Sequence, residues 1–209
     1  MKNDKSGNCK LCGIISNPFL WGELRPCDTP FHISQSFITI PALGPLCLGH
    51  AMIISRQHFV SLLSMSSYLR REFESICLEL SSVWPDQLIT FAEHGSSITD
   101  GGGPCIAHTH INVIPKVPDD LLSLEIYGHK LIAAGTLESL PEMVNSYFLI
   151  GKKGKWFLYD TANAPSQYIR QLLFNHYSLP HWDWRLLPNE NLAKETLSKW
   201  NRLCCIDKT

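Results

Sequence analysis

The chain contains 209 residues, with 18 Lys and Arg against 19 Asp and Glu and a net charge of -1. This balance provides no basic surface of the kind that binds nucleic acid or anionic membranes, so neither is an expected partner. Hydrophobic residues make up 44% of the chain, enough for a packed core, and no apolar run reaches the roughly 18 residues that span a bilayer. The polar N-terminal segment MKNDKSGNCKLCG predicts a cytoplasmic protein without a secretory signal.

The eight cysteines are therefore expected to be free thiols or metal ligands rather than a disulfide framework. Cys27, Cys47 and Cys77 lie among apolar neighbours and are expected in the core. Cys9 and Cys12 instead form a C-x-x-C in a polar segment, a spacing that lets two thiolates hold one metal ion. Because redox proteins use the same spacing, a redox or metal-handling function is an alternative.

Apolar patterning in the first half of the chain predicts four strands and one long helix. The strands are predicted at residues 36–40, 50–55, 88–93 and 106–114. Apolar residues at spacings of three and four predict an amphipathic helix over residues 66–84, ended by a proline. A Gly-rich loop, HGSSITDGGGP, separates the last two strands.

The second half of the chain has a mixed pattern. Residues 121–131 fit either a strand or a short helix. Residues 147–150 and 156–159 predict a hairpin that turns through GKKG. Helices are predicted from about residue 165 to 177 and from about residue 189 to 201. Strands followed by terminal helices indicate an α+β fold with an antiparallel sheet.

The segment HTHINVIP at residues 108–115 concentrates polar side chains on one face of a predicted strand. Side chains alternate between the faces of a strand, so His108, His110 and Asn112 share a face while Thr109 and Ile111 point to a core. Two imidazoles directly after GGGPC are a poor choice for a purely structural strand. We therefore interpret this face as a reactive one, in preference to an exposed sheet face that carries histidines by chance.

The pattern H-x-H-x-N followed by VIP resembles the histidine-triad (HIT) motif, His-φ-His-φ-His-φ-φ, with Asn112 in place of the third His. The segment LGHAMIISRQHFVSL resembles the family's G-H-x-φ-φ-x-P-x-x-H segment, with Ser55 where Pro is usual. CKLCGII resembles the N-terminal C-x-x-C of zinc-bearing members. The resemblance covers residues 9 to 116 and implies a HIT-like α+β fold, with an antiparallel sheet of about five strands and one main helix.

Residues 1–116 are accordingly predicted to be a HIT-like core with an N-terminal zinc knuckle. Residues 117–209 are predicted to be a C-terminal α/β extension packed on the same domain, with Trp182 and Trp184 in its core rather than stacked on a base. PSQYIRQLL and WDWR are similar to segments of longer HIT-like proteins. Many small members are two-fold dimers that join their sheets, so a homodimer is one expectation and replacement of the partner by the extension is another.

In zinc-bearing members the ligands are the two thiolates, the last His of the G-H segment and the first His of the triad. The resemblance therefore implies zinc ligands at Cys9, Cys12, His58 and His108. Four N and S ligands without an open position form a structural site rather than a catalytic one. Unliganded surface thiols are the alternative, and His50 is a substitute ligand that we expect to pack near the strand instead.

The resemblance also implies that His110 attacks the α-phosphorus of a nucleotide and forms a covalent nucleotidyl-histidine, with His108 and Asn112 completing the catalytic set. This chemistry requires a neutral imidazole with one free nitrogen, while an acceptor holds the proton on the other. Backbone N–H groups of the Gly-rich loop, at Gly102 and Gly103, are the expected donors to the phosphoryl oxygens.

Asn112 is the main departure from the family pattern. An amide forms hydrogen bonds but does not titrate near neutral pH, so it favours leaving groups such as pyrophosphate over amines. The family branch with Gln at this place transfers nucleotidyl groups to phosphate oxygens. We therefore predict a nucleotide hydrolase or nucleotidyltransferase that acts on a nucleotide or nucleotide conjugate at a phosphoanhydride. The alternative is a catalytically weak HIT-like module that binds nucleotides or a protein.

Three further residues are substrate-binding candidates. Phe37 lies where members build the apolar wall of the base pocket, but Phe37 and Ile38 face opposite ways, so at most one of them lines a pocket. His94 follows a strand beside the reactive one and could approach the phosphates, with an ordinary loop histidine as the alternative. Arg170 could reach a phosphate, although an exposed helix position is the commoner role of such an arginine.

Overall fold

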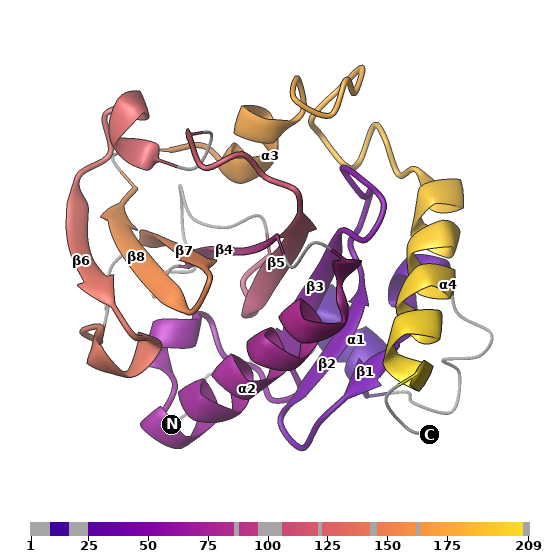
Figure 1. The fold of residues 1–209 in the computed structure, drawn as a ribbon, viewed down its shortest axis with the longest axis horizontal. Helices are drawn as coiled ribbons and strands as arrows, with labels where there is room; N and C mark the ends of the chain where they lie inside the picture. The colour runs from indigo at the N-terminus through magenta and orange to yellow at the C-terminus, as the bar shows by residue number, and fades with distance from the viewer. Residues whose placement is uncertain are drawn as a thin grey trace.

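The computed structural model describes residues 9–16, 25–85, 88–95, 106–120, 123–142, 146–161 and 164–206. They form an α+β fold built on an eight-stranded antiparallel sheet, which confirms the predicted class (Figure 1). The strands are β1 (His32–Ile33), β2 (Phe37–Pro41), β3 (Ala51–Ser55), β4 (Ile89–Gly95), β5 (His110–Pro115), β6 (Leu131–Gly135), β7 (Tyr147–Lys152) and β8 (Lys155–Asp160). The α-helices are α1 (Lys10–Ile15), α2 (Ser67–Val83), α3 (Tyr168–Leu173) and α4 (Glu190–Ile206). Short 3-10 helices are η3 (Pro26–Asp28), η4 (Leu62–Ser64), η7 (Leu124–Tyr127) and η8 (Leu137–Ser139). Within the described ranges, none of the helices is long and apolar enough to cross a membrane.

The strand order is β1-β2-β3-β5-β4-β7-β8-β6. The first five strands come from residues 32–115, but the sheet continues beyond β4 because β7 pairs with it, from Thr90 opposite Lys152 to Gly95 opposite Tyr147. The prediction of about five strands is therefore wrong. The sheet is larger because β4 pairs with β5 along one edge only. The backbone N–H and C=O groups along its other edge pair with β7, a strand from the C-terminal part of the chain.

Most predicted elements occur near their expected positions, including the β7–β8 hairpin, whose turn places Lys153 at φ 51 and Gly154 at φ 74. The strand predicted at residues 106–114 begins only at His110, and the helix predicted at residues 165–177 is α-helical only over α3. α1, β1 and β6 were not predicted. The first two are too short, at six and two residues, to show a period.

The two faces of β5 separate the core from the site. Ile111 and Val113 point to the face covered by α2 and pack in one core cluster with Phe37 and Phe73. The opposite face carries the side chains of His110, Asn112 and Ile114, as alternation requires. α2 begins after Ser66, whose hydroxyl accepts the Leu69 N–H at 3.5 Å, and its buried stripe covers the sheet. Both faces of the sheet are largely apolar, and His110 and Asn112 are polar side chains on the face opposite α2.

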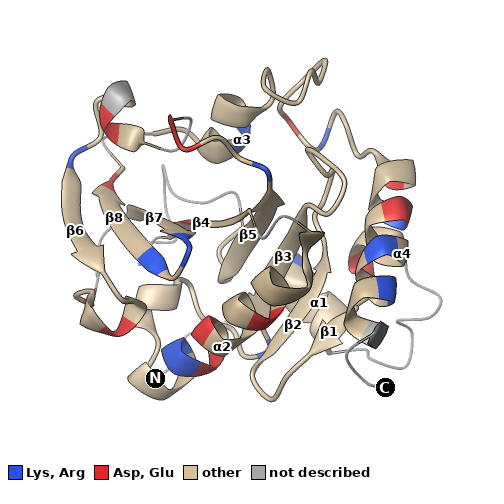
Figure 2. Ribbon diagram, in the orientation of Figure 1, with Lys and Arg blue, Asp and Glu red and all other residues tan. Residues whose placement is uncertain are grey.

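Helix α4 is tied to the segment that precedes β3. The Trp200 ring is fully buried and stacks on Phe31 at 5.2 Å between centroids, and its indole N–H donates to the Gly49 carbonyl at 3.0 Å. The hydroxyl of Thr196 accepts the Gly49 N–H at 3.1 Å. Gly49 has φ 92, and a Cβ there would lie 2.1 Å from the Trp84 ring, so only glycine fits. Acidic and basic residues are interspersed along α4 (Figure 2).

A buried carboxylic acid joins β4, β7 and η4. Glu93 accepts the Leu62 N–H at 2.9 Å and the Tyr147 O–H at 2.6 Å, and the Tyr147 oxygen in turn accepts the Leu63 N–H at 3.0 Å. Burial raises the pKa of Glu93 to about 7. The contribution of the Glu93 side chain to the contact between β4 and β7 therefore depends on pH.

We expect Glu93→Gln to change how stability depends on pH. The glutamic acid of an unfolded chain titrates near about 4.3, so the folded state holds this proton more tightly. The contribution of Glu93 to the free energy of unfolding is full below that pH and is lost as pH rises through about 7. Urea unfolding should show wild type losing on the order of 4 kcal/mol relative to the variant between about pH 4 and pH 8. A pH-independent difference between the two proteins would contradict this assignment.

Candidate active site and metal centre

The four predicted metal ligands lie together. Cys9 and Cys12 come from the start of α1, His58 from the segment after β3, and His108 from the residues just before β5, and their ligand atoms all lie within 4.8 Å of one another. The Cys12 Sγ atom lies 3.2 Å from Nδ1 of His58 and 3.4 Å from Nδ1 of His108, and Cys9 Sγ also lies 3.4 Å from the latter. Tetrahedral zinc with ordinary Zn–S and Zn–N bonds separates sulfur and nitrogen ligands by about 3.6 Å. The cluster is therefore compatible with zinc.

The environment of His108 fixes the ring in the form that binds a metal. Its Nε2–H donates to the Ser55 carbonyl at 2.7 Å, so the Nδ1 lone pair faces the thiols. Burial lowers the pKa of His108 to about 4, which keeps the imidazole neutral. We predicted that His108 shares a strand face with His110, but β5 begins at His110. Instead, the backbone N–H of Thr109 bonds to the Phe59 carbonyl at 2.7 Å and holds His108 before the strand.

His110 has the hydrogen bonding that a nucleophilic imidazole requires. Its Nδ1–H donates to the His108 carbonyl at 2.7 Å, which leaves the lone pair on Nε2. Burial lowers the pKa of His110, so the ring is neutral near neutral pH. His108 therefore has two roles. Its Nδ1 atom faces the thiols of the Cys/His cluster, and its backbone carbonyl sets the tautomer of His110.

Asn112 is held by two neighbours. The Leu46 N–H donates to Nδ1 of His50 at 3.0 Å, so Nε2–H of that ring donates to Oδ1 of Asn112 at 3.1 Å. The Asn112 Nδ2 group donates to the Ala92 carbonyl at 3.2 Å. Both nitrogens of His50 are engaged here and not at the thiols, as expected, and burial lowers its pKa to about 3. Asn112 thus ties β5 to β4 and to the residue that precedes β3, but it supplies no titrating group.

A pocket opens beside these residues. Its wall includes His94, His110, Asn112, Tyr168, Arg170 and Trp184. The first three come from β4 and β5, and the others come from α3 and the HWDWR segment. Tyr168 was not predicted to lie here. Trp184 was predicted to lie in the core, and it packs partly buried against a core cluster while also lining the pocket.

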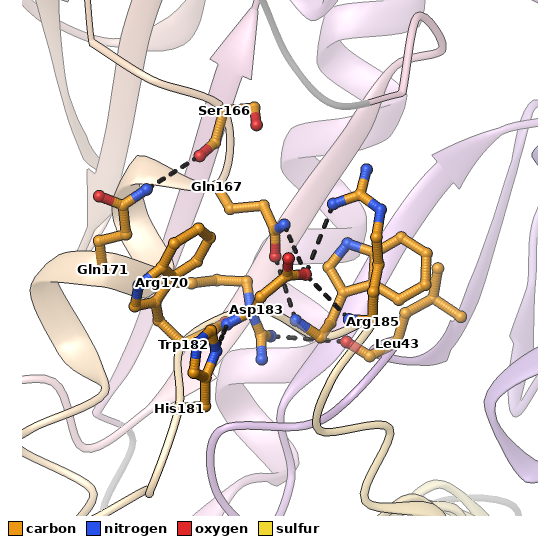
Figure 3. Close-up of polar contacts among 10 residues, drawn as sticks. Leu43, Ser166, Gln167, Arg170, Gln171, His181, Trp182, Asp183 and Arg185 are labelled. Carbon is orange, nitrogen blue, oxygen red and sulfur yellow. Dashed lines mark hydrogen bonds and ion pairs between the residues drawn. The ribbon is translucent and has the colours of Figure 1, made fainter.

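Arg170 is buried at 7% exposure and lies on the pocket wall rather than on an exposed helix face. Its Nε–H donates to the Trp182 carbonyl at 2.8 Å, and Nη1 lies 3.5 Å from the Leu43 carbonyl (Figure 3). These two carbonyl oxygens orient the guanidinium. The positive charge of Arg170 contributes to the lowered pKa of His50, which places it within electrostatic reach of the site.

Gln167 positions the aromatic segment against α3. It has φ 60, in the left-handed region that is uncommon for a residue with a side chain. Its amide donates to Asp183 Oδ1 at 2.9 Å and accepts the Trp184 N–H at 3.2 Å (Figure 3). Both bonds fix the HWDWR segment where Trp184 forms part of the pocket wall.

One other sequence-based candidate, Phe37, lies elsewhere. Phe37 is fully buried against Phe73 on the α2 face, so it does not line the pocket that contains His110. Its neighbour Ile38 pairs with Ile54, which pairs with His110, so Ile38 is on the face of the site. The prediction that Phe37 lines the base pocket is therefore wrong for the His110 pocket, because neighbouring residues of a strand face opposite ways and Phe37 faces α2. The candidates Gly102 and Gly103 lie outside the described residues.

Comparison with known proteins finds similarity to HIT-like and histidine triad proteins. No family model matches the sequence. An uncharacterized HIT-like protein of Borreliella burgdorferi is 29% identical over 118 residues, which cover 54% of this chain and 78% of that protein. A zinc-bound histidine triad family protein of Mycobacterium smegmatis is 19% identical, with coverage of 56% of this chain and 81% of that one and a TM-score of 0.41. A hypothetical histidine triad nucleotide-binding protein of Sulfolobus tokodaii is 18% identical over 93% of this chain and 95% of its own, with a TM-score of 0.38.

Proposed function

We propose that this chain is a HIT-like nucleotide hydrolase or nucleotidyltransferase that acts through a covalent nucleotidyl-histidine on His110. The observation that carries the proposal is the 2.7 Å bond from His110 Nδ1–H to the His108 carbonyl, inside a pocket that also holds Arg170. A neutral imidazole with its Nε2 lone pair exposed to a pocket beside a fixed cation is suited to attack a phosphorus atom that carries negative charge.

The reaction proceeds in two displacements. The Nε2 lone pair of His110 forms a bond to the α-phosphorus, and the bond from phosphorus to the leaving phosphate oxygen breaks with its electrons on that oxygen. Water or an acceptor oxygen then displaces the histidine and releases the nucleotide. Arg170 receives the anionic oxygens, and Asn112 keeps β4 and β5 together beneath the reacting atoms. A phosphate leaving group fits a site where Asn112 cannot titrate.

We also propose that the Cys9, Cys12, His58 and His108 cluster holds a structural zinc ion. The supporting observation is the set of sulfur-to-nitrogen distances of 3.2 to 3.4 Å, together with the hydrogen bond that fixes the His108 tautomer. A zinc ion held by these four residues would tie α1 to the residues that precede β5. It would also help to keep the backbone carbonyl of His108 at the distance that His110 needs.

We propose further that residues 117–209 are a C-terminal extension of a core at residues 1–116, and that the nucleotide lies between the two. The core contributes His110 and Asn112 to the pocket wall, and the extension contributes Arg170 and Trp184. Because β7 occupies the β4 edge, we expect the extension rather than a second copy of the chain to cover that edge.

The proposal is tested by intact-protein mass spectrometry after rapid quenching without acid. Wild type and His110→Ala are incubated with nucleoside triphosphates, dinucleoside polyphosphates and nucleotide sugars. We expect a nucleoside monophosphate adduct on wild type alone, whose mass identifies the base. The absence of both adduct and product in every mixture would contradict the proposal. It would favour the alternative of a nucleotide- or protein-binding module, which an Asn112 held by His50 and the Ala92 carbonyl also suits.

Arg170→Lys and Arg170→Gln are expected to weaken turnover through substrate binding. A guanidinium held by two carbonyl oxygens presents a planar fork to phosphate, and lysine does not reproduce it. We expect kcat/KM to fall by roughly 10- to 100-fold in both variants, mainly through KM. Exposed Arg71, which pairs with Glu138 on the surface, provides the matched control as Arg71→Gln. Unchanged KM in the Arg170 variants would contradict the assignment.

A further inference from the structure

His94 is a second imidazole in the His110 pocket, and nothing above assigns it a step. The pairing of β4 with β5 ends at Ala92 and Asn112, while β4 itself continues to Gly95 beside β7. Alternation places His94 on the same face as Ala92, and therefore on the face of Asn112 and His110. His94 and His110 thus stand on the two strands just beyond the last paired residues, and both line the pocket.

The polar atoms of His94 are buried without an evident structural role. Both ring nitrogens are buried, and among the described residues neither has a hydrogen-bond partner. The ring packs on Phe148 at 4.5 Å between centroids, which holds its orientation. Buried polar atoms are normally paired because an unpaired one costs free energy. An imidazole left in this state beside a reactive histidine is poised to bond to a ligand.

The site also lacks a titrating group where the family motif has one, because Asn112 occupies the third triad position. We propose that His94 is the proton donor of this site and protonates the leaving oxygen while His110 bonds to phosphorus. The inference rests on the proposed function and assigns a catalytic residue to it. It accounts at once for the unpaired imidazole and for the missing third histidine.

The proton transfers balance over the two displacements. In the first, the His94 imidazolium gives its proton to the oxygen on which the breaking P–O bond leaves its electrons, and the ring becomes neutral. In the second, neutral His94 takes a proton from the water that attacks the nucleotidyl group on His110. Release of the nucleotide restores both rings, and no further reactant is needed.

The charge on His94 depends on its surroundings. Among the described residues, the charged or ionisable groups around it are His110 on β5, Tyr168 and Arg170 on α3, and His129. Burial, with smaller contributions from His110 and His129, lowers the pKa of His94 to about 4, so the ring is neutral in the empty pocket. A polyphosphate brings opposite charge beside the ring and raises that pKa. The proton is therefore acquired together with the substrate.

The test compares leaving groups of different basicity. Wild type and His94→Asn are assayed with the 2,4-dinitrophenyl, 4-nitrophenyl and phenyl esters of AMP. A general acid matters most for the most basic leaving group, so we expect the variant to lose about 10²- to 10³-fold in kcat with the phenyl ester. With the 2,4-dinitrophenyl ester, which needs no proton, the expected loss is less than about threefold. Equal losses with all three esters would make His94 a packing residue and overturn the inference.

The matched control is His129→Asn. His129 belongs to the same aromatic cluster, with its ring 5.2 Å from both Phe148 and Tyr168, but it does not line the pocket. Its replacement is expected to affect all three esters to the same degree. Thermal unfolding of both variants verifies that they fold.

A second readout uses whichever nucleotide gives a covalent adduct on wild type. Because a general acid must be protonated in the substrate complex, kcat should fall at alkaline pH in wild type and in His129→Asn, and this decline should vanish in His94→Asn. A decline that persists in His94→Asn overturns the inference and leaves the proposed function intact. Failure of wild type to form any adduct or product would contradict both the proposed function and the role of His94.

Discussion

His110→Ala is expected to lower kcat/KM by at least about 10³-fold with every substrate that wild type accepts. The imidazole supplies the only bond from protein to phosphorus in the proposed reaction. The carbonyl of His108 that now holds Nδ1–H at 2.7 Å would have no group to orient. Steady-state assays with the substrate identified by the mass measurement provide the comparison.

The control for this variant is His176→Ala, which removes an exposed imidazole outside the pocket. Its kcat/KM should remain within about twofold of wild type, as expected for surface substitutions. Retention of more than a tenth of the wild-type kcat by His110→Ala would show that another group attacks the phosphorus and would remove the assigned role.

Cys12→Ser is expected to abolish zinc binding and to destabilise the fold by about 3 kcal/mol or more. Cys12 Sγ contacts both histidines of the cluster, so its loss separates α1 from the residues that precede β5. For a chain of this length that change lowers the melting temperature by about 10 °C. Calorimetry and elemental analysis of the purified protein measure the two effects, and a chelator should reproduce them in wild type.

Cys204→Ser is the matched control, because Cys204 has a similar partial exposure and lies outside the cluster. It should keep the metal content of wild type. Wild type that contains no zinc when purified from zinc-supplemented medium, and whose melting temperature is unaffected by zinc, would contradict the structural metal site.

Local pattern was enough to predict the elements that position the reactive residues. Strand alternation in HTHINVIP separated Ile111 from His110, and the apolar spacing of residues 66–84 predicted α2 closely. The four residues of the Cys/His cluster came from a family resemblance, because nothing in local pattern brings residues 9 and 108 together. The structure places their ligand atoms within 4.8 Å of one another.

The features that the sequence did not predict depend on contacts between segments that are distant in the chain. The hairpin at residues 147–159 was predicted, but its pairing with β4 was not, since any strand edge offers the same backbone groups. Arg170 was predicted as a phosphate ligand or an exposed residue. It is buried because the segment after α3 folds back on this helix, so that the Trp182 carbonyl accepts the Arg170 Nε–H. Phe37 was placed on the wrong side because alternation gives two faces without saying which one meets α2.

The stereochemical course at the α-phosphorus tests covalent catalysis by His110 without any substitution. A nucleoside 5′-(α-thiotriphosphate) of one configuration, chosen for the base that forms the adduct, is hydrolysed in water enriched in oxygen-18. The configuration of the thiophosphate product is then determined by phosphorus NMR. Two successive in-line displacements, the first by His110 and the second by water, predict net retention. Net inversion would mean that water attacks phosphorus directly, and it would contradict a nucleotidyl-histidine on the pathway.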